Sequence, residues 1–218
     1  MAKFYYHPMY TRAEEALLEV HGKRQDVPAA FRVERYLQDR RCLFRGHAGL
    51  DVVGDGDVLT VDGHGVGKEL PGGAGYMARQ KLAVPGGRAR SPAWIARQLK
   101  KDGLTNHRIL IKFFPCLTAL ETRFGRASTA SALARSLGYT HVVVQGYAGE
   151  TLLGDKGRRV NPTGTAHDWR DAYLYRKYYD SHGAEVSVER AREIAGDQVA
   201  HKNRNVAVEQ EEPQLIDL

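Results

Sequence analysis

Cysteine is scarce in this chain, which has two among its 218 residues, Cys42 and Cys116. Two cysteines cannot build the disulfide framework of a small secreted domain, so we expect free thiols and a reducing compartment. The sequence also lacks a run of about 18 apolar residues, which argues against a membrane-spanning helix. Its first residues lack the apolar core and cleavage site of a signal peptide. We therefore expect a protein without a leader, cytoplasmic in the cell that makes it and available for delivery into a target cell.

Acidic residues are fewer than basic ones: 26 Asp and Glu stand against 32 Lys and Arg, a net charge of +6. A basic surplus admits nucleic acid, anionic lipid or a polyanionic small molecule as a partner and does not select among them. Hydrophobic residues make up 42% and charged residues 27%, values typical of globular proteins, which argues against wholesale disorder. Glycine is concentrated between residues 46 and 87, which indicates turns and close backbone approach.

Short apolar runs alternate with helical patterns along the middle of the chain, which predicts an α/β fold. The order strand, helix, strand, helix, strand predicts right-handed crossovers and a largely parallel sheet. We expect a helical lead-in over 1–40, a main domain over 41–201 and a polar tail over 202–218. The predicted strands are 42–47, 57–62, 108–114 and 140–145, with a hairpin at 151–160; the predicted helices are 11–20, 28–40, 92–103, 124–137 and 188–201; and residues 66–90 are predicted to form a long glycine-rich loop.

Two reactive side chains directly follow predicted buried strands. His64 comes just after the strand that ends at residue 62, and Cys116 just after the strand that ends at residue 114. Ligands of open α/β sheets bind at the carboxyl ends of the strands, so two neighbouring strands would bring these side chains face to face. An imidazole beside a thiol is the minimal cysteine nucleophile, because the imidazole takes the proton and the thiolate attacks a carbonyl carbon. Gly65 would leave room for substrate, and its backbone N–H is suited to stabilising an oxyanion.

An apolar strand followed by His-Gly, then a second apolar strand followed by Cys, resembles the caspase-like cysteine peptidases. The resemblance is closest to the autoprocessing cysteine peptidase domain of RTX and glucosylating bacterial toxins, and it covers about residues 41–170. It implies a caspase-like, mostly parallel central sheet flanked by helices, with a β-hairpin flap. It also implies a cysteine endopeptidase with His64 as general base, Cys116 as nucleophile and Gly65 beside the oxyanion.

The resemblance extends to an activator, because inositol hexakisphosphate switches on these toxin domains by binding basic residues of the flap and its surroundings. Several Lys and Arg side chains suit a polyphosphate, since each supplies a charge-assisted hydrogen bond. By resemblance we expect a bacterial toxin or effector with a protein substrate, an immunity or host protein as a further candidate partner, and no metal, membrane or nucleic-acid partner. The basic positions that match are Lys156, Arg158, Arg159, Arg170 and Lys177.

Two other interpretations stay open. Pro115 removes a backbone donor directly before the candidate nucleophile, and the glycine-rich loop is long. Both features favour a catalytically inactive caspase-like domain that binds or scaffolds. The second alternative is a different hydrolase at the same sheet edge, which would use Asp62 and His64, with a metal ion held together with His47 or His107.

Overall fold

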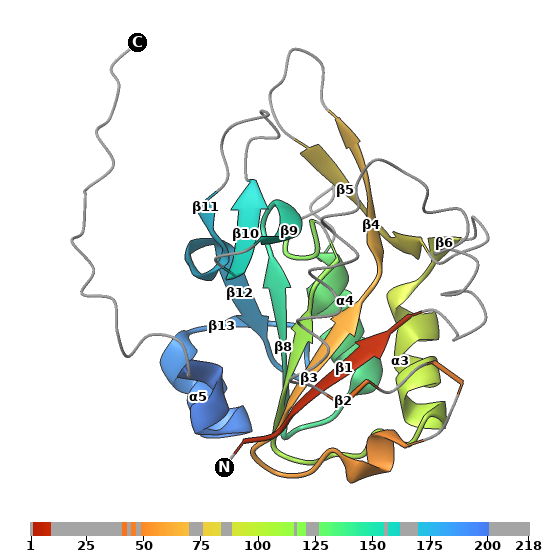
Figure 1. Ribbon diagram of the computed structural model, residues 1–218, viewed down its shortest axis with the longest axis vertical. Helices are drawn as coiled ribbons and strands as arrows, with labels where there is room; N and C mark the ends of the chain where they lie inside the picture. Colours follow the sequence, from red (N-terminus) through yellow and green to blue (C-terminus); the bar gives the residue numbers. More distant parts are fainter. Residues whose placement is uncertain are drawn as a thin grey trace.

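The structure is a computed structural model (Figure 1), and it describes residues 2–9, 41–42, 45–46, 49–69, 76–83, 89–115, 117–120, 127–154, 157–161 and 170–200. The predicted helices at 11–20 and 28–40 and the polar tail at 202–218 lie outside these residues.

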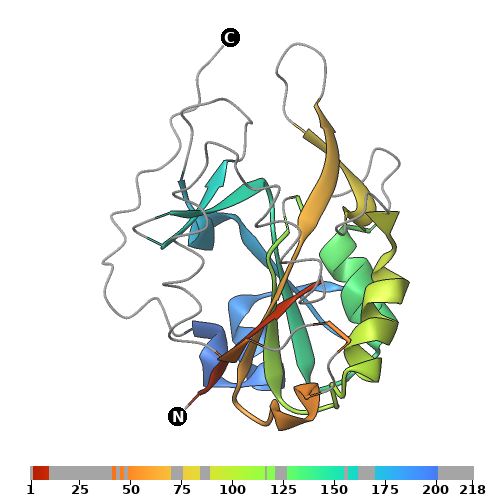
Figure 2. The same cartoon turned by 45° about the vertical axis from the view of Figure 1, so that its right-hand side comes forward.

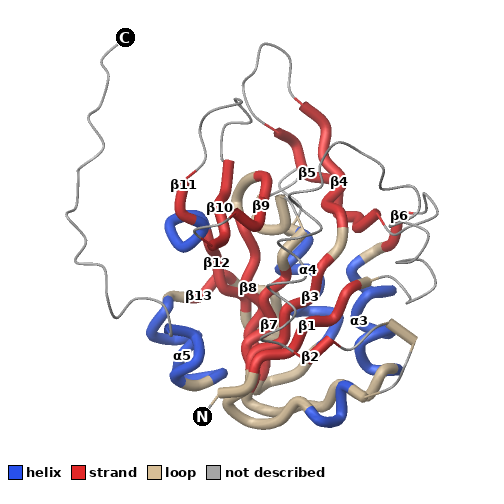
Figure 3. Tube along the Cα trace, in the orientation of Figure 1, coloured by secondary structure: helices blue, strands red, loops and turns tan. Residues whose placement is uncertain are grey.

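Seven strands form a central sheet in the order β13-β12-β8-β7-β3-β1-β2 (Figures 1 and 3). Neighbours from β2 to β8 pair parallel, and β12 and β13 are added antiparallel at one side. The predicted α/β fold with a largely parallel sheet is therefore confirmed. The strands are β1 (Phe4–Pro8), β2 (Arg41–Cys42), β3 (Val58–Asp62), β7 (Ile109–Phe113), β8 (Val142–Tyr147), β12 (Arg176–Tyr179) and β13 (Glu185–Val186).

The strand β1 lies inside this sheet, between β2 and β3. It pairs with β3 along its whole length, from Phe4 opposite Val58 to Pro8 opposite Asp62. The expected lead-in over 1–40 is therefore wrong for these residues, which belong to the main sheet. Five residues ending in proline carry too little periodicity to mark a strand in the sequence. Their pairing is decided by a partner more than fifty positions away in the chain.

Helices cover both faces of the sheet (Figure 2). α3 (Pro92–Lys101) and α4 (Thr129–Leu137) pack on one face, and α5 (Val188–Ala195) packs on the other. Each helix begins after a serine, Ser91, Ser128 or Ser187, whose hydroxyl accepts the backbone N–H three residues further on. None of the helices in the described part of the chain is long and apolar enough to cross a membrane.

Some predicted elements have different bounds. Of the predicted strand at 42–47, Cys42 lies in β2, residues 45 and 46 form a turn, and the other residues lie outside the described part of the chain. α4 begins at Thr129 instead of 124, where Ser128 supplies the cap. α5 ends at Ala195 instead of 201, because Gly196 leaves the helix with φ +99° and a short 3-10 helix, η4 (Asp197–Ala200), follows. A second short 3-10 helix, η1 (Leu50–Val52), precedes β3.

The region predicted as a long loop, 66–90, instead holds most of a second sheet. β4 (His64–Glu69), β5 (Tyr76–Ala83) and β6 (Ala89–Arg90) pair antiparallel in the order β4-β5-β6. Between Gly65 and Gly67 the register shifts, so that one residue of β4 stands against three of β5. The prediction of a loop was wrong because strand hydrogen bonds are made with a neighbour in space, which glycine spacing does not reveal.

The predicted hairpin at 151–160 is confirmed as the first part of a flap. β9 (Glu150–Gly154) and β10 (Gly157–Asn161) pair antiparallel, and β11 (Arg170–Asp171) adds to β10. A short 3-10 helix, η3 (Ala172–Tyr175), leads from β11 into β12. In Figure 1 the flap and the β4–β5 hairpin rise on opposite sides of the carboxyl ends of β3 and β8.

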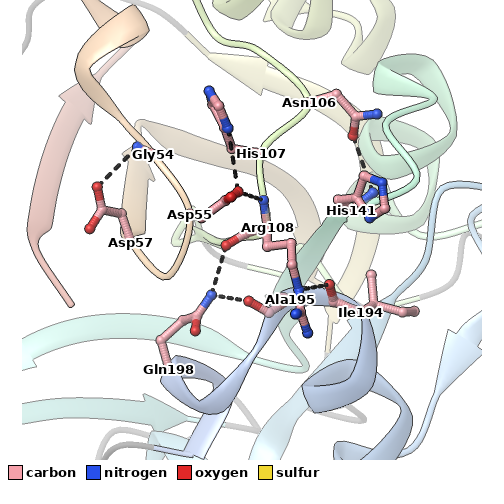
Figure 4. Close-up of polar contacts among 10 residues, drawn as sticks. All are labelled: Gly54, Asp55, Asp57, Asn106, His107, Arg108, His141, Ile194, Ala195 and Gln198. Carbon is pink, nitrogen blue, oxygen red and sulfur yellow. Dashed lines mark hydrogen bonds and ion pairs between the residues drawn. The ribbon is translucent and has the colours of Figure 1, made fainter. Parts of the chain in front are cut away.

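At the amino end of β7, Arg108 ties the sheet to α5 (Figure 4). Its guanidinium donates to the backbone carbonyls of Glu193 and Ile194, at 3.0 and 3.3 Å. A cation at a helix carboxyl end satisfies free carbonyls and suits the helix dipole. The backbone N–H of Arg108 also donates to the Asp55 carboxylate at 2.7 Å, and this bond holds the pKa of that carboxyl below its usual range.

We predict that Arg108→Gln destabilises the protein by about 1 kcal/mol, because the carbonyls at the end of α5 lose a charged donor. Denaturant unfolding measures the change. Arg190→Gln is the matched control, since Arg190 makes an exposed ion pair with Glu193 on the same helix. It should change the free energy of unfolding by less than about 0.5 kcal/mol. Equal effects of the two substitutions would contradict the assigned role.

Candidate active site

The candidate site lies where β3 and β7, which are adjacent and parallel, end together. Their register pairs Val61 with Phe113, and His64 and Cys116 each come three residues after that pair. His64 is the first residue of β4, and of its side chain nothing is described. Cys116 lies outside the described residues, but Pro115 and Leu117 on either side of it are both buried. The structure therefore shows that the strands before His64 and Cys116 are neighbours, and it does not test whether the two side chains face each other.

The chain on either side of Cys116 is fixed at both ends. The backbone N–H of Phe114 donates to the carbonyl of Val61 at 2.9 Å, which links the end of β7 to β3. The N–H of Leu117 donates to the carbonyl of Gly149 at 2.7 Å, where β8 turns into the flap. These bonds fix Phe114 beside β3 and Leu117 beside the end of β8.

Leu117 has a left-handed backbone conformation, with φ +63°, and no other residue than glycine has a positive φ in the part of the chain that is described. A leucine in this conformation costs about 1–2 kcal/mol, because its Cβ crowds the following carbonyl. The side chain is only 4% exposed, and burial together with the bond to Gly149 holds the conformation in place. Strain of this kind is concentrated at functional sites in proteins, and here it directly follows the candidate nucleophile.

The chain leading into His64 is braced by Asp62. One carboxylate oxygen of Asp62 accepts the hydroxyl of Tyr6, and the other accepts the backbone N–H of Gly63 at 2.8 Å. The carbonyl of Asp62 accepts the N–H of Met9, also at 2.8 Å. Asp62 therefore positions the turn that begins β4. Tyr6 was not singled out in the sequence, because its role depends on β1 lying beside β3.

Gly65, the expected neighbour of the oxyanion, pairs with Leu82 on β5 at the start of the irregular register. Such irregularities are common next to active sites, where they redirect a strand. The structure therefore places Gly65 one residue past His64 on a strand whose course changes there.

The flap packs directly on the segment that carries Cys116. The rings of Phe114 and Tyr147 meet edge to face with centroids 5.6 Å apart, and Val160 of β10 completes a buried cluster with them. The hydroxyl of Thr151 on β9 donates to the carbonyl of Phe114 at 2.7 Å. A displacement of the flap would therefore disturb Phe114, which lies two residues before the candidate nucleophile.

The sequence did not reveal a row of polar side chains that crosses the central sheet on the face of α5. Side chains on one face of a strand alternate, and the register aligns one residue from each of five adjacent strands. Gln145 and Tyr178 are each 2% exposed, and the Gln145 Oε1 and Tyr178 hydroxyl have no hydrogen-bond partner in the described structure. Burial raises the pKa of Tyr178 to about 12. We call this set the polar row: Tyr6, Thr60, Lys112, Gln145 and Tyr178.

The predicted activator residues belong to three strands of the structure, except for one that is not described. Arg158 and Arg159 are consecutive residues of β10, and their side chains are not described. Arg170 on β11 is exposed and donates to the hydroxyl of Tyr175 at 2.9 Å. Lys177 lies on β12 in the central sheet and pairs with Glu185 at 2.8 Å. Lys156 lies outside the described residues.

The proposed metal ligands are not assembled by the residues that can be placed. His107 contacts Asp55 at 3.3 Å at the amino end of β7, on the edge of the sheet opposite His64. His47 lies outside the described residues. Within the described ranges no three His, Cys, Asp or Glu side chains are grouped as metal ligands. A hollow of about 440 Å³ also opens at that opposite edge, between Asp55, Arg108 and Gln198, and so lies away from the candidate site.

We predict that Gly149→Ala disturbs the candidate site and destabilises the protein by about 2–3 kcal/mol. An added Cβ would lie 2.5 Å from Val160 Cγ1 and 2.6 Å from the carbonyl oxygen of Asn161, so the turn that holds Leu117 must shift. Thermal unfolding measures the effect. Gly54→Ala is the control, because its Cβ would meet nothing closer than 4.0 Å. A neutral Gly149→Ala would show that the turn is not tightly constrained.

Comparisons with protein-family models, with curated proteins and with solved structures find no match to this chain. The assignment of a function therefore depends on the residues and geometry described above.

Proposed function

We propose that this protein is a cysteine endopeptidase with His64 and Cys116 as its catalytic dyad. The observation that carries the proposal is the parallel pairing of β3 with β7. Val61 lies opposite Phe113, and His64 and Cys116 each follow three residues later in the sequence, at the same edge of the sheet. The strained Leu117 and the packed flap support it, because both restrain the segment around the candidate nucleophile. The small β4-β5-β6 sheet and the flap flank this edge and would form the walls of a substrate groove.

In this mechanism the His64 imidazole accepts the proton of the Cys116 thiol, and the thiolate attacks the peptide carbonyl carbon. The carbonyl oxygen gains negative charge, which the backbone N–H of Gly65 would stabilise. The protonated imidazole then gives its proton to the leaving amine as the C–N bond breaks. Water, deprotonated by His64, hydrolyses the thioester and regenerates the thiol. Overall one peptide bond and one water molecule become a carboxylic acid and an amine.

The alternative of an inactive binding domain predicts an ordinary thiol at Cys116, and alkylation separates the two. We predict that iodoacetamide labels Cys116 at pH 6.5 at least about tenfold faster than Cys42, because the imidazole raises the thiolate fraction. His64→Ala should remove this advantage, while His182→Ala, an exposed histidine after β12, should keep it. Rates come from mass spectrometry of the labelled peptides.

A peptide chloromethylketone serves as a second probe and should label Cys116 and not the Cys116→Ala variant. The labelling is run with and without inositol hexakisphosphate, so that a requirement for an activator does not hide the activity. If Cys116 is alkylated no faster than Cys42 with or without the activator, the catalytic dyad does not exist. Activity that survives Cys116→Ala and is lost with a chelator would instead favour a metal hydrolase.

We further propose that the polar row is the part of the molecule that fits a polyanionic activator such as inositol hexakisphosphate. Lys112 lies in the row, and Arg176 follows on the same face of β12, its guanidinium 5.6 Å from the Tyr178 ring centre. Two buried polar atoms, Gln145 Oε1 and the Tyr178 hydroxyl, have no hydrogen-bond partner among the described residues. A buried hydroxyl without a partner is costly, and a phosphate group that accepted the Tyr178 hydroxyl proton would relieve that cost. The setting that fits such an activator is a bacterial toxin or effector acting inside a target cell.

We predict that inositol hexakisphosphate at about 100 times its dissociation constant stabilises the Cys116→Ala protein by about 2.7 kcal/mol, or about 5–10 °C in melting temperature. Lys112→Gln and Arg176→Gln should each reduce the shift by at least half. Lys100→Gln, an exposed lysine of α3, is the control that should not. An unchanged melting temperature, or a shift that inorganic phosphate reproduces at equal charge, would contradict a specific site.

A further inference from the structure

Two arginines converge on a single tryptophan at the start of α3. The guanidinium of Arg90 lies 4.7 Å from the ring centre of Trp94, and that of Arg45 lies 5.6 Å from the same centre. Trp94 is half-buried and packs against the main core, so the indole is a fixed platform. Each cation is attracted to the ring, but the two cations repel each other. The cluster therefore places two positive charges on one indole ring. We call it the arginine–tryptophan cluster: Arg45, Arg90 and Trp94.

The backbone around the cluster adds to this positive charge. Arg90 directly precedes Ser91, the cap of α3, and the first turn of the helix contains no acidic residue. A helix amino end carries partial positive charge, so a cation there is unfavourable and an anion is favourable. The Nε of Arg90 is buried and has no hydrogen-bond partner in the part of the chain that is described. Among those residues no carboxylate forms an ion pair with Arg90, so none of them neutralises its charge.

The cluster lies beside the candidate active site. Arg45 donates from Nε to the carbonyl of Met9 at 3.1 Å, and the N–H of Met9 is bonded to Asp62, two residues before His64. On the other side, Arg90 pairs with Leu82, which pairs with Gly65. Two strand spacings separate Arg90 from Gly65 in this ladder, a distance of about 10 Å, which an extended peptide covers with about three residues.

We propose that the arginine–tryptophan cluster is a subsite for a carboxylate side chain of the peptide substrate, about three residues from the bond that is cut. Arg90 binds the carboxylate through its planar donor group, Arg45 adds charge, and Trp94 supports the apolar part of the side chain. The proposal rests on the peptidase function for its role in specificity. The anion site itself stands on the geometry of the cluster.

Binding is tested without catalysis, in a Cys116→Ala, Trp169→Phe protein whose only tryptophan is Trp94. The probes are the blocked pentapeptides Gly-Gly-Glu-Gly-Gly and Gly-Gly-Gln-Gly-Gly and inorganic phosphate, followed by Trp94 fluorescence. We expect the Glu peptide to bind at least about fivefold more tightly than the Gln peptide at low salt, and salt to reduce the difference. Arg90→Gln should abolish the difference and Arg90→Lys should weaken it. Arg135→Gln, the same charge change on an exposed position of α4, should leave it unchanged.

Equal binding of the Glu and Gln peptides would overturn the proposal, and so would phosphate binding more tightly than the Glu peptide. Cleavage is then profiled with wild-type protein on a mixed peptide library. We expect Glu or Asp to be enriched about three residues from the cut bond, and Arg90→Gln to remove the enrichment. Charge-selective binding with no cleavage in any condition would reject the peptidase and keep the site. Cleavage with neither acidic enrichment nor selective binding would keep the peptidase and reject the site.

Discussion

The parallel pairing of β3 with β7 is the constraint on which the candidate site depends. Val61 lies opposite Phe113, and the chain leaves both strands at the same edge of the sheet. A slip of the register by one residue would turn every side chain of a strand to the other face. Leu59, Ile111 and their neighbours would then leave the apolar layer under α3 and α4, so the core itself fixes the register. Hydrophobic burial in the sheet therefore sets the relative positions of the segments that carry His64 and Cys116.

The segment around Cys116 is the meeting point of three parts of the fold. Backbone hydrogen bonds link it to β3 through Phe114 and to the turn at Gly149 through Leu117. The ring of Phe114 packs against Tyr147 and against Val160 of the flap. The strain at Leu117 persists because these contacts determine the local backbone more strongly than the residue's own preference. A ligand that bound beneath the flap would act on this segment through the packing of Phe114 and Tyr147, which gives the proposed activator a physical route to the site.

The basic surplus of the chain is divided between different surfaces. Some cations serve the fold, such as Arg108 at the end of α5 and Lys177 beside Glu185. Others belong to the two anion sites that we propose: Lys112 and Arg176 on the face of α5, and Arg90 with Arg45 at the start of α3. Net charge alone could not distinguish these roles, because a pair such as Lys177–Glu185 is formed only when β12 and β13 come together.

The sequence by itself determined the features that depend on local signals. Ser91 before Pro92 marked the start of α3, the apolar run ending at residue 114 marked β7, and the hairpin at 151–160 was visible from its glycines. The same local signals placed His64 and Cys116 just beyond strand ends. Only the tertiary structure decided that β1 enters the sheet beside β3, that the glycine-rich region pairs into β4, β5 and β6, and that the polar row and the arginine–tryptophan cluster exist. The place of β1, the polar row and the contact of Arg45 with Trp94 join residues far apart in the chain, and the hydrogen bonds and burial that stabilise such features leave no periodic trace in either partner's sequence.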